Sequence, residues 1–352
     1  MKQIIGRTAL LCAALALSLA GPARAFAGTA RETPLNICAT IPDLGDLARQ
    51  IGGDHVSVTV FAKGTEDPHF LEARPSFVKA ASEADALVMV GMELEVGWIP
   101  PIILNSRNPK IQVGQPGYIQ ASAAITPLEV PTGVVDRSQG DVHMAGNPHF
   151  LIDPVSGIKV ARLLADKFGE LRPEDKADFD ANYKKFHDRV CEGLVGSDLA
   201  KKYDGEKLAA LAEHGALETF LKSQGDDKLL GGWLGLFAGH KGVKAVADHN
   251  LWPYFARRYG IDIVGFMEPR PGVAPTTRHL KEIVEQMKRD NVKLIFQSPY
   301  FDPRHGEFVS KLTGAKIVLL AHQVGGRPGT DDYISMCDYN ARTLAQAMKD
   351  AQ

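Results

Sequence analysis

Residues 243–266, VKAVADHNLWPYFARRYGIDIVGF, contain one complete unit of the expected fold. Val243–Ala247 and Ile261–Phe266 are short runs rich in apolar and β-branched residues, the pattern of buried strands. The helical pattern of Leu251–Tyr259 lies between them. A strand, a helix and a second strand in this order predict a parallel pair of strands with a helix packed on the sheet.

The same alternation continues on both sides of this stretch. Before it, the pattern predicts strands at Leu35–Ile41, His55–Phe61, Ala86–Gly91 and Lys110–Val113, and helices at Asp43–Ile51 and Pro75–Ala84. After it, the pattern predicts strands at Val292–Phe296 and Ile317–Ala321, and helices at Thr276–Arg289, Arg304–Leu312 and Asp332–Met348. We therefore predict an α/β protein of two lobes, each a mostly parallel sheet flanked by helices.

A long helix near the middle of the chain is predicted to join these lobes. It begins near Pro173, directly after a helix at Val155–Phe168, and it is charged on one side and apolar on the other. The predicted N-terminal lobe is residues 26–172, the linker helix 173–198 and the C-terminal lobe 199–352. The alternative is an ordinary surface helix of one domain.

The N-terminus has the layout of an export signal. Lys2 and Arg7 precede an apolar run at Thr8–Ala20, and Ala23–Ala25 has the A-x-A pattern of a cleavage site. We predict a signal peptide at residues 1–25 and a mature protein in the periplasm of a Gram-negative bacterium. In that oxidising compartment, Cys191–Cys337 is the disulfide pairing to test first.

Charge and cysteine spacing exclude two classes of function. The chain has 40 basic and 42 acidic residues, a formal net charge of −2, and no long basic run, so nucleic-acid binding has no support. None of the cysteines of the mature chain lies in a C-x-x-C pair, which argues against a cysteine zinc cluster.

Four histidines carry the candidate chemistry. The tetrapeptide Pro-His-Phe-Leu occurs twice, with His69 and His149 presented from loops that proline stiffens. His249 and His322 each follow a predicted strand, where the loops of an α/β sheet converge on a ligand site. Neutral imidazole is the commonest protein ligand for metals, so the four predict a metal site in a cleft between the lobes. A lone histidine at a strand end is more often a hydrogen-bonded loop residue.

The long loop predicted at Gln115–Asn147 adds one more candidate. It is rich in Gly, Pro and Ser, and its single histidine, His143, could capture a metal transiently.

The motifs around these histidines resemble the zinc/manganese solute-binding proteins of ABC transporters. The matching segments, in order along nearly the whole mature chain, are TEDPH at 65–69, RPS at 74–76, ADALV at 84–88, GMELE at 91–95, NPHFLIDP at 147–154 and DHNLWPYFARRYG at 248–260. The type it most resembles is the periplasmic high-affinity zinc-binding protein.

That resemblance implies a ligand set and a metal. The resemblance implies, by position, that the first three ligands are His69, His149 and His249. In the manganese branch of the family a Glu stands at the third position, so the resemblance implies that a His at 249 favours Zn²⁺. Many members carry an acidic fourth ligand where this chain has His322. The fourth ligand is therefore His322, a nearby carboxylate such as Glu66 or Asp67, or water.

The chain departs from the family pattern in two further places. Gln115–Asn147 stands where many zinc members have a long His/Asp-rich loop. Ser197–Gly242 is longer than expected between the linker helix and the third ligand, and its sequence suggests no role.

The resemblance implies capture of Zn²⁺ and its delivery to an inner-membrane ABC permease driven by an ATPase. We expect a monomer and no enzyme activity; loading of the site by a periplasmic zinc metallochaperone stays open. One alternative is the same transport role for Mn²⁺ or Fe²⁺. Another is a zinc hydrolase in which Glu66 or Asp67 acts as the base, although the chain has no H-E-x-x-H helix.

Overall fold

The computed structural model describes residues 33–133, 142–270 and 272–351. All the helices and strands below belong to one compact unit, Pro34–Gln352. The predicted signal peptide, residues 1–25, lies outside the described residues. Among the residues described, no helix has both the length and the apolar character that crossing a bilayer requires.

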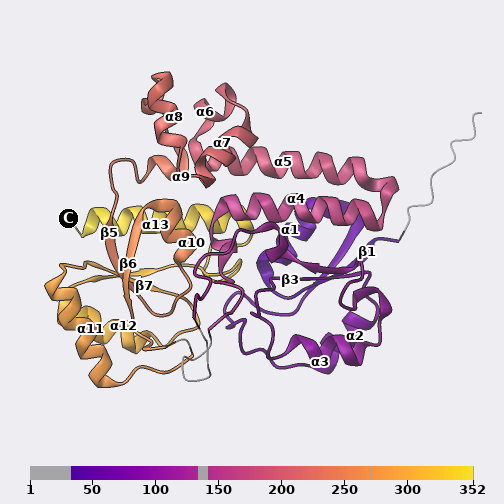
Figure 1. The fold of residues 1–352 in the computed structure, drawn as a ribbon, viewed down its shortest axis with the longest axis horizontal. Helices are drawn as coiled ribbons and strands as arrows, with labels where there is room; N and C mark the ends of the chain where they lie inside the picture. The colour runs from indigo at the N-terminus through magenta and orange to yellow at the C-terminus, as the bar shows by residue number, and fades with distance from the viewer. Residues whose placement is uncertain (1–32, 134–141, 271, 352) are drawn as a thin grey trace, which may run out of the picture. The chain divides into compact units, whose positions relative to one another are not determined.

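The first sheet has four parallel strands in the order β2-β1-β3-β4. They are β1 (Leu35–Ala39), β2 (Val56–Val60), β3 (Ala86–Met89) and β4 (Tyr118–Gln120). Every residue of β3 is buried, as expected of a parallel strand with helices on both faces. The helices of this half are α1 (Pro42–Gly52), α2 (Pro75–Ser82) and α3 (Ile99–Ser106) (Figure 1).

The second sheet repeats this arrangement, with four parallel strands in the order β6-β5-β7-β8. They are β5 (Val243–Ala247), β6 (Ile261–Phe266), β7 (Leu294–Gln297) and β8 (Lys316–Leu319). Its helices are α10 (Pro253–Tyr259), α11 (Thr277–Arg289), α12 (Pro303–Thr313) and α13 (Tyr333–Asp350). In both sheets the first strand in sequence is central and the second is at the edge, so the two lobes share one topology. The predicted two-lobe α/β fold is confirmed.

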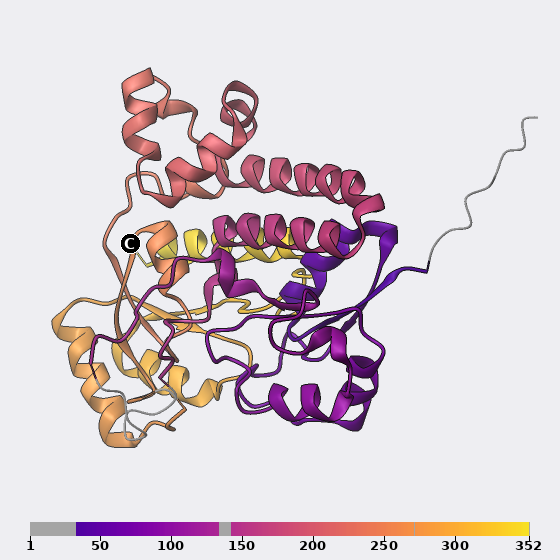
Figure 2. The ribbon, with the colours of Figure 1, turned by 45° about the vertical axis from the view of Figure 1, so that its right-hand side comes forward.

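Two long helices connect the first sheet to the rest of the chain. The helix α4 (Pro154–Leu171) and the helix α5 (Lys176–Val195), separated by a 3-10 turn at Pro173–Asp175, lie side by side and run in opposite directions (Figures 1 and 2). The helix α5 packs against α4 and α1 and also against α6, α7 and α9. Its role as the linker, and the predicted lobe boundaries, stay predictions.

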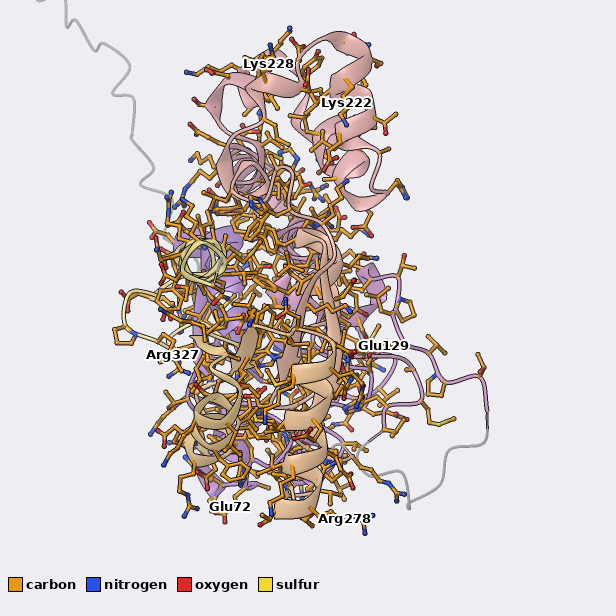
Figure 3. The ribbon with its side chains drawn as sticks, turned by 90° about the vertical axis from the view of Figure 1, so that its left-hand side faces the viewer. Glu72, Glu129, Lys222, Lys228, Arg278 and Arg327 are labelled. Atoms are coloured by element: carbon orange, nitrogen blue, oxygen red, sulfur yellow. The ribbon has the colours of Figure 1, made fainter. Side chains whose placement is uncertain are left out.

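The segment Ser197–Gly242, for which the sequence suggested no role, is a helical insert. Its helices are α6 (Ser197–Lys202), α7 (Gly205–Glu213), α8 (Leu217–Gln224) and α9 (Gly232–Gly235). Lys222 and Lys228 mark this insert in Figure 3, at the end of the unit away from Arg278 on α11.

Two predictions in the first half of the chain are wrong. Lys110–Val113 is not a strand, because Pro109 starts a 3-10 turn in which the Asn108 side chain accepts a hydrogen bond from the Lys110 backbone N–H. The true strand, β4, has three residues and lies inside the stretch predicted as loop. It pairs with β3 just after Gly117, where a Cβ would come within 2.3 Å of the Asp85 carbonyl oxygen. The helix α3 was not predicted.

The Cys191–Cys337 pairing, which the sequence offered as the first to test, is not formed. Both cysteines are free and buried, as is Cys38. The Cys191 side chain on α5 faces α7, where its thiol donates to the Gly205 carbonyl oxygen over 3.5 Å. Cys337 lies on α13 beside Tyr333, so the two thiols point into different parts of the core.

A buried ion pair links α4 to α10. Asp153 caps the N-terminus of α4 by accepting a hydrogen bond from the Val155 backbone N–H. Its two oxygens also accept from Arg258 Nε and Nη2 at 2.7 and 2.8 Å, and both side chains are almost fully buried. Because Arg258 also donates to the Ala212 carbonyl oxygen, its guanidinium depends on partners from two other segments of the chain.

We expect Asp153→Asn to lower the free energy of unfolding by about 3–5 kcal/mol, since it leaves the Arg258 charge buried without its main counter-charge. Urea denaturation of the metal-free protein measures this. The matched control is Glu282→Gln, which breaks an exposed i,i+4 pair with Arg278 and should cost less than about 1 kcal/mol. Equal effects of the two substitutions would contradict the prediction.

Candidate metal centre

Three of the predicted ligands meet at one point. His69, His149 and His249 each offer a ring nitrogen, and these nitrogens all lie within 4.8 Å of one another. The three residues are only 8, 4 and 6 % exposed. His69 is on the loop after β2, His149 directly precedes the 3-10 turn Phe150–Ile152, and His249 follows β5. Their separation in sequence means that the fold, and not local structure, brings them together.

His69 is oriented by its own loop. Asp67 Oδ1 accepts a hydrogen bond from the His69 backbone N–H at 3.0 Å and lies 2.7 Å from its Nδ1. The Trp98 indole N–H donates to the Pro68 carbonyl oxygen at 2.9 Å, which fixes the chain just before the histidine. Burial alone would raise the pKa of Asp67, but the hydrogen bond from His69 holds that pKa below its ordinary value. The Asp67 carboxylate therefore stays charged and leaves His69 Nε2 for a ligand.

His249 is oriented by residues at the ends of three strands of the second sheet. Asp248, directly after β5, accepts from the Ser298 backbone N–H at 2.6 Å and from the His249 backbone N–H at 2.8 Å. Glu268, just beyond β6, has its Oε2 2.6 Å from His249 Nδ1. The ring stacks on Phe301, with centroids 5.4 Å apart. A carboxylate on Nδ1 fixes the ring orientation and raises the basicity of Nε2, as is common for metal-bound histidines.

His149 has a buried nitrogen with no partner. Within the described parts of the chain, its Nδ1 makes no hydrogen bond although it is shielded from water. Burial, with the neighbouring imidazoles adding to it, lowers the pKa of His149 well below 6.5, so the ring is neutral at neutral pH. Because an unsatisfied buried polar atom costs free energy, this nitrogen is suited to a bound cation.

The turn after His149 is anchored from α13. The Tyr333 hydroxyl donates to the carbonyl oxygens of Leu151 and Asp153, at 2.7 and 3.0 Å. Gly157 makes room for this ring, because a Cβ at that position would lie 2.3 Å from the Tyr333 hydroxyl oxygen.

His322, the fourth candidate, lies beside the three. Its ring centroid is 4.9 Å from that of His149, and the Tyr300 hydroxyl lies 2.8 Å from its Nδ1. The residue is 7 % exposed, and burial together with the charge of His69 lowers its pKa from 6.5 to about 3. His322 is thus a neutral imidazole next to the other three. We call His69, His149, His249 and His322 the cleft histidines.

A fifth imidazole covers the group. His143 Nε2 lies 3.3 Å from His69 Nε2, and the two rings stack with centroids 5.4 Å apart. A pocket of 330 Å³ opens here, lined by Glu129, Val142, His143, Asn147, His149, His249 and Asn250. His143 therefore stands where an ion would enter or leave.

The two carboxylates considered as fourth ligands are engaged elsewhere. Glu66 accepts from the Lys63 backbone N–H at 2.8 Å and lies 3.6 Å from Arg74, inside its own loop. Asp67 holds His69. The orienting residues Glu268 and Tyr300 were not predicted, although both follow strands at the same end of the second sheet as His249.

Comparisons with known proteins give the family. The protein-family model described as "Zinc-uptake complex component A periplasmic" matches residues 37–222 and 234–347 of this chain. The metal ABC transporter substrate-binding lipoprotein ScbA of Streptococcus cristatus is 24 % identical over 90 % of both chains. The manganese ABC transporter substrate-binding lipoprotein PsaA of Streptococcus pneumoniae is 23 % identical over 89 % of both.

Solved structures share the fold. The crystal structure of ZnuA has a TM-score of 0.64 and 22 % identity, covering 89 % of this chain and 99 % of that one. FpvC from Pseudomonas aeruginosa, solved with Mn²⁺, has a TM-score of 0.69 and 21 % identity, covering 91 and 100 %. With a family match over most of its length, the chain belongs to the periplasmic zinc-uptake component A family, the substrate-binding proteins of metal ABC transporters.

Proposed function

We propose that this protein binds Zn²⁺ at the cleft histidines and delivers it to an ABC permease. The observation that carries the proposal is the set of three buried imidazoles whose ring nitrogens lie within 4.8 Å of one another. His69, His149 and His249 supply three nitrogen ligands, and His322 is the fourth. Asp67, Glu268 and Tyr300 orient three of the four rings through their Nδ1 atoms.

The donor set favours zinc over manganese. Imidazole suits Zn²⁺, which prefers four ligands in a tetrahedron, whereas Mn²⁺ is better served by carboxylate and water oxygens. Asp67 and Glu268 are each hydrogen-bonded to an Nδ1 atom, and among the described residues the ligand atoms that lie within 4.8 Å of one another here are those of the three histidines. The relatives named for manganese leave this choice open, so the metal needs a direct test.

A hydrolase is disfavoured by the same geometry. A zinc hydrolase needs a metal-bound water with a free base beside it. Glu66 is held within its own loop, and Asp67 is occupied by His69, so neither of the predicted bases is available. With His322 as the fourth ligand, the position that a catalytic water needs would be filled.

The remaining parts of the proposal concern the cellular setting. The protein would act as a monomer in the periplasm after its signal peptide is removed, and its partners would be the permease and the ATPase. A periplasmic zinc metallochaperone is a further candidate partner, because the pocket beside His143 gives the site an opening to a donor protein.

Competition between metals tests the choice of ion. The purified apo-protein, dialysed against a defined mixture of Zn²⁺ and Mn²⁺ and analysed for bound metal, should retain Zn²⁺ in large excess because nitrogen donors prefer the softer ion. Retention of Mn²⁺ in preference to Zn²⁺ would overturn the assignment of zinc while leaving metal transport intact.

Substitution tests the ligands one at a time. His69→Ala, His149→Ala and His249→Ala should each weaken Zn²⁺ binding more than about tenfold, since even the loss of a residue that orients a ligand costs that much. Calorimetric titration measures the affinity, and circular dichroism checks that each variant is folded. His214→Ala, which removes an exposed histidine, is the control and should bind as the wild type does. Unchanged affinity in the three cleft variants would contradict the proposal.

The buried neutral rings also predict an acid-sensitive apo-protein. The folded-state pKa of His322 is about 3, against about 6.5 in an unfolded chain, so protons favour the unfolded state. The stabilising contribution is complete above about pH 6.5 and is lost progressively as the pH falls toward about 3. Urea unfolding of the metal-free protein from about pH 7 to about pH 4 should show this decrease.

His322→Gln should make the decrease smaller, because glutamine does not bind a proton in this range. The exposed-site variant His214→Gln should retain the decrease seen in the wild type. Identical pH profiles for His322→Gln and the wild type would show that His322 is not a buried neutral ring.

A further inference from the structure

A second group of metal-binding side chains lies between α5 and the helical insert. Here α5, α6 and α7 enclose a pocket of 620 Å³ whose walls include Tyr183, His187, Cys191 and Glu206. None of its lining residues lines the pocket at the cleft histidines. In Figure 3 the insert, marked by Lys222 and Lys228, is well separated from Glu129, which lines the cleft pocket.

Two donors in this pocket are already in place. His187 and Cys191 are one helical turn apart on α5, and both are buried, at 4 and 2 % exposure. His187 Nε2 lies 3.6 Å from Cys191 Sγ. With bonds of about 2.0 Å to nitrogen and 2.3 Å to sulfur, two ligands of one tetrahedral ion are about 3.5 Å apart. The observed separation therefore matches that of two ligands on one metal.

The orientation of the imidazole fits the same function. Asp188 Oδ1 lies 3.3 Å from His187 Nδ1, so a proton on Nδ1 is held by the carboxylate. This leaves the lone pair of Nε2 directed toward the thiol. A carboxylate, a histidine and a metal in this order is the usual arrangement around zinc.

A third donor approaches from α7. Glu206 Oε1 lies 3.6 Å from His187 Nε2 and accepts a hydrogen bond from the Tyr183 hydroxyl at 2.8 Å. Its side chain is 64 % exposed, so a rotation can bring the carboxylate closer to the thiol. The adjacent Gly205 allows the close approach of α7, because a Cβ there would lie 2.6 Å from His187 Cε1 and 3.4 Å from Cys191 Sγ.

We propose that His187, Cys191 and Glu206 bind a second divalent transition-metal ion, of the class that accepts thiolate and imidazole ligands, with Zn²⁺ as the representative ion. On binding, the sulfur–metal bond forms, and the thiol proton that Cys191 now donates to the Gly205 carbonyl oxygen is released to water. The reaction needs no oxidant or reductant. This site is independent of the function proposed for the cleft histidines.

His187 and Cys191 could instead form a nucleophilic Cys-His-Asp arrangement with Asp188. Reactive cysteines are partly exposed, whereas Cys191 is 2 % exposed and its thiol donates to the Gly205 carbonyl oxygen. A metal ion can still displace the proton, because a thiol that coordinates a metal is deprotonated outright. The structure therefore favours metal binding over covalent catalysis.

Cobalt provides the test, since a thiolate bound to Co²⁺ produces a charge-transfer absorption band that imidazole ligands do not. The full-length mature protein, titrated with excess Co²⁺, should show this band and bind one ion more than the Cys191→Ser variant. The band should be absent from Cys191→Ser and weakened in His187→Gln. It should persist in His249→Ala, which damages only the cleft site.

Cys38→Ser and Cys337→Ser are the matched controls, because each also removes a buried thiol and should retain the band. Absence of the band in the wild type at excess Co²⁺ would overturn the proposal, as would a band that survives in Cys191→Ser. If Cys191→Ser does not fold, as judged by circular dichroism, the stoichiometry and band of Glu206→Gln and His187→Gln decide the matter. Wild-type behaviour in both would then also overturn it.

Discussion

The structure of the cleft depends on the cost of burying several imidazoles next to one another. Water cannot solvate a charge there, and each protonated ring would repel the others, so burial lowers the pKa of His149 and His322. The neutral rings of His149 and His322 also contain lone pairs that need a partner. His149 Nδ1 has none within the described residues, and a cation can satisfy such a nitrogen where no side chain does.

The fold provides this cluster through the repeated topology of its two sheets. All strands of each sheet are parallel, so their carboxyl ends lie at one end of that sheet. The loop that carries His69 begins at this end of the first sheet, and the loops that carry His249 and His322 begin at this end of the second. The carboxyl ends of β6 and β7 in the second sheet also lead to the orienting residues Glu268 and Tyr300. A change of register in β5 or β8 would displace His249 or His322, and one in β6 or β7 would displace the residue that orients it.

Much of this could be predicted from the sequence. The strand periodicity predicted the two α/β lobes. The twin Pro-His-Phe-Leu motif and the strand ends identified four histidines, of which His69, His149 and His249 offer ring nitrogens within 4.8 Å of one another, while the ring of His322 lies beside that of His149. The elements that escaped prediction were short. The strand β4 has only three residues, and it follows Gly117, where the backbone passes too close to the Asp85 carbonyl oxygen for a side chain. Neither property produces a hydrophobic periodicity in the sequence.

Side-chain partners were harder to predict than the ligands. Glu268 and Tyr300 could have been identified by applying the strand-end rule to every strand of the second sheet. The sequence left the pairing of Cys191 and Cys337 open, because pairing depends on which way α5 and α13 turn their cysteines, and sequence spacing does not encode that. The helical insert contributes Glu206 to the second group of side chains on α5, and the family model leaves residues 223–233 of the insert unmatched.

Release of the ion is constrained by contacts that cross the cleft in two places. Beside His149 and His249, the Asn147 side chain donates to the Asn250 carbonyl oxygen, and the Tyr254 hydroxyl donates to the Asn147 carbonyl oxygen. The Asp153–Arg258 pair, which links the start of α4 to α10, strengthens this connection.

The second crossing lies between the loops of His69 and His322. There the Gln323 side chain donates to the Glu66 carbonyl oxygen, and the chain passes so close that a Cβ on Gly64 would lie 2.1 Å from the Val324 carbonyl oxygen. A wide hinge motion would have to break both sets of contacts at once. A movement of one loop would have to break only one set, because Glu66 lies on the loop of His69 and Asn147 lies beside His149.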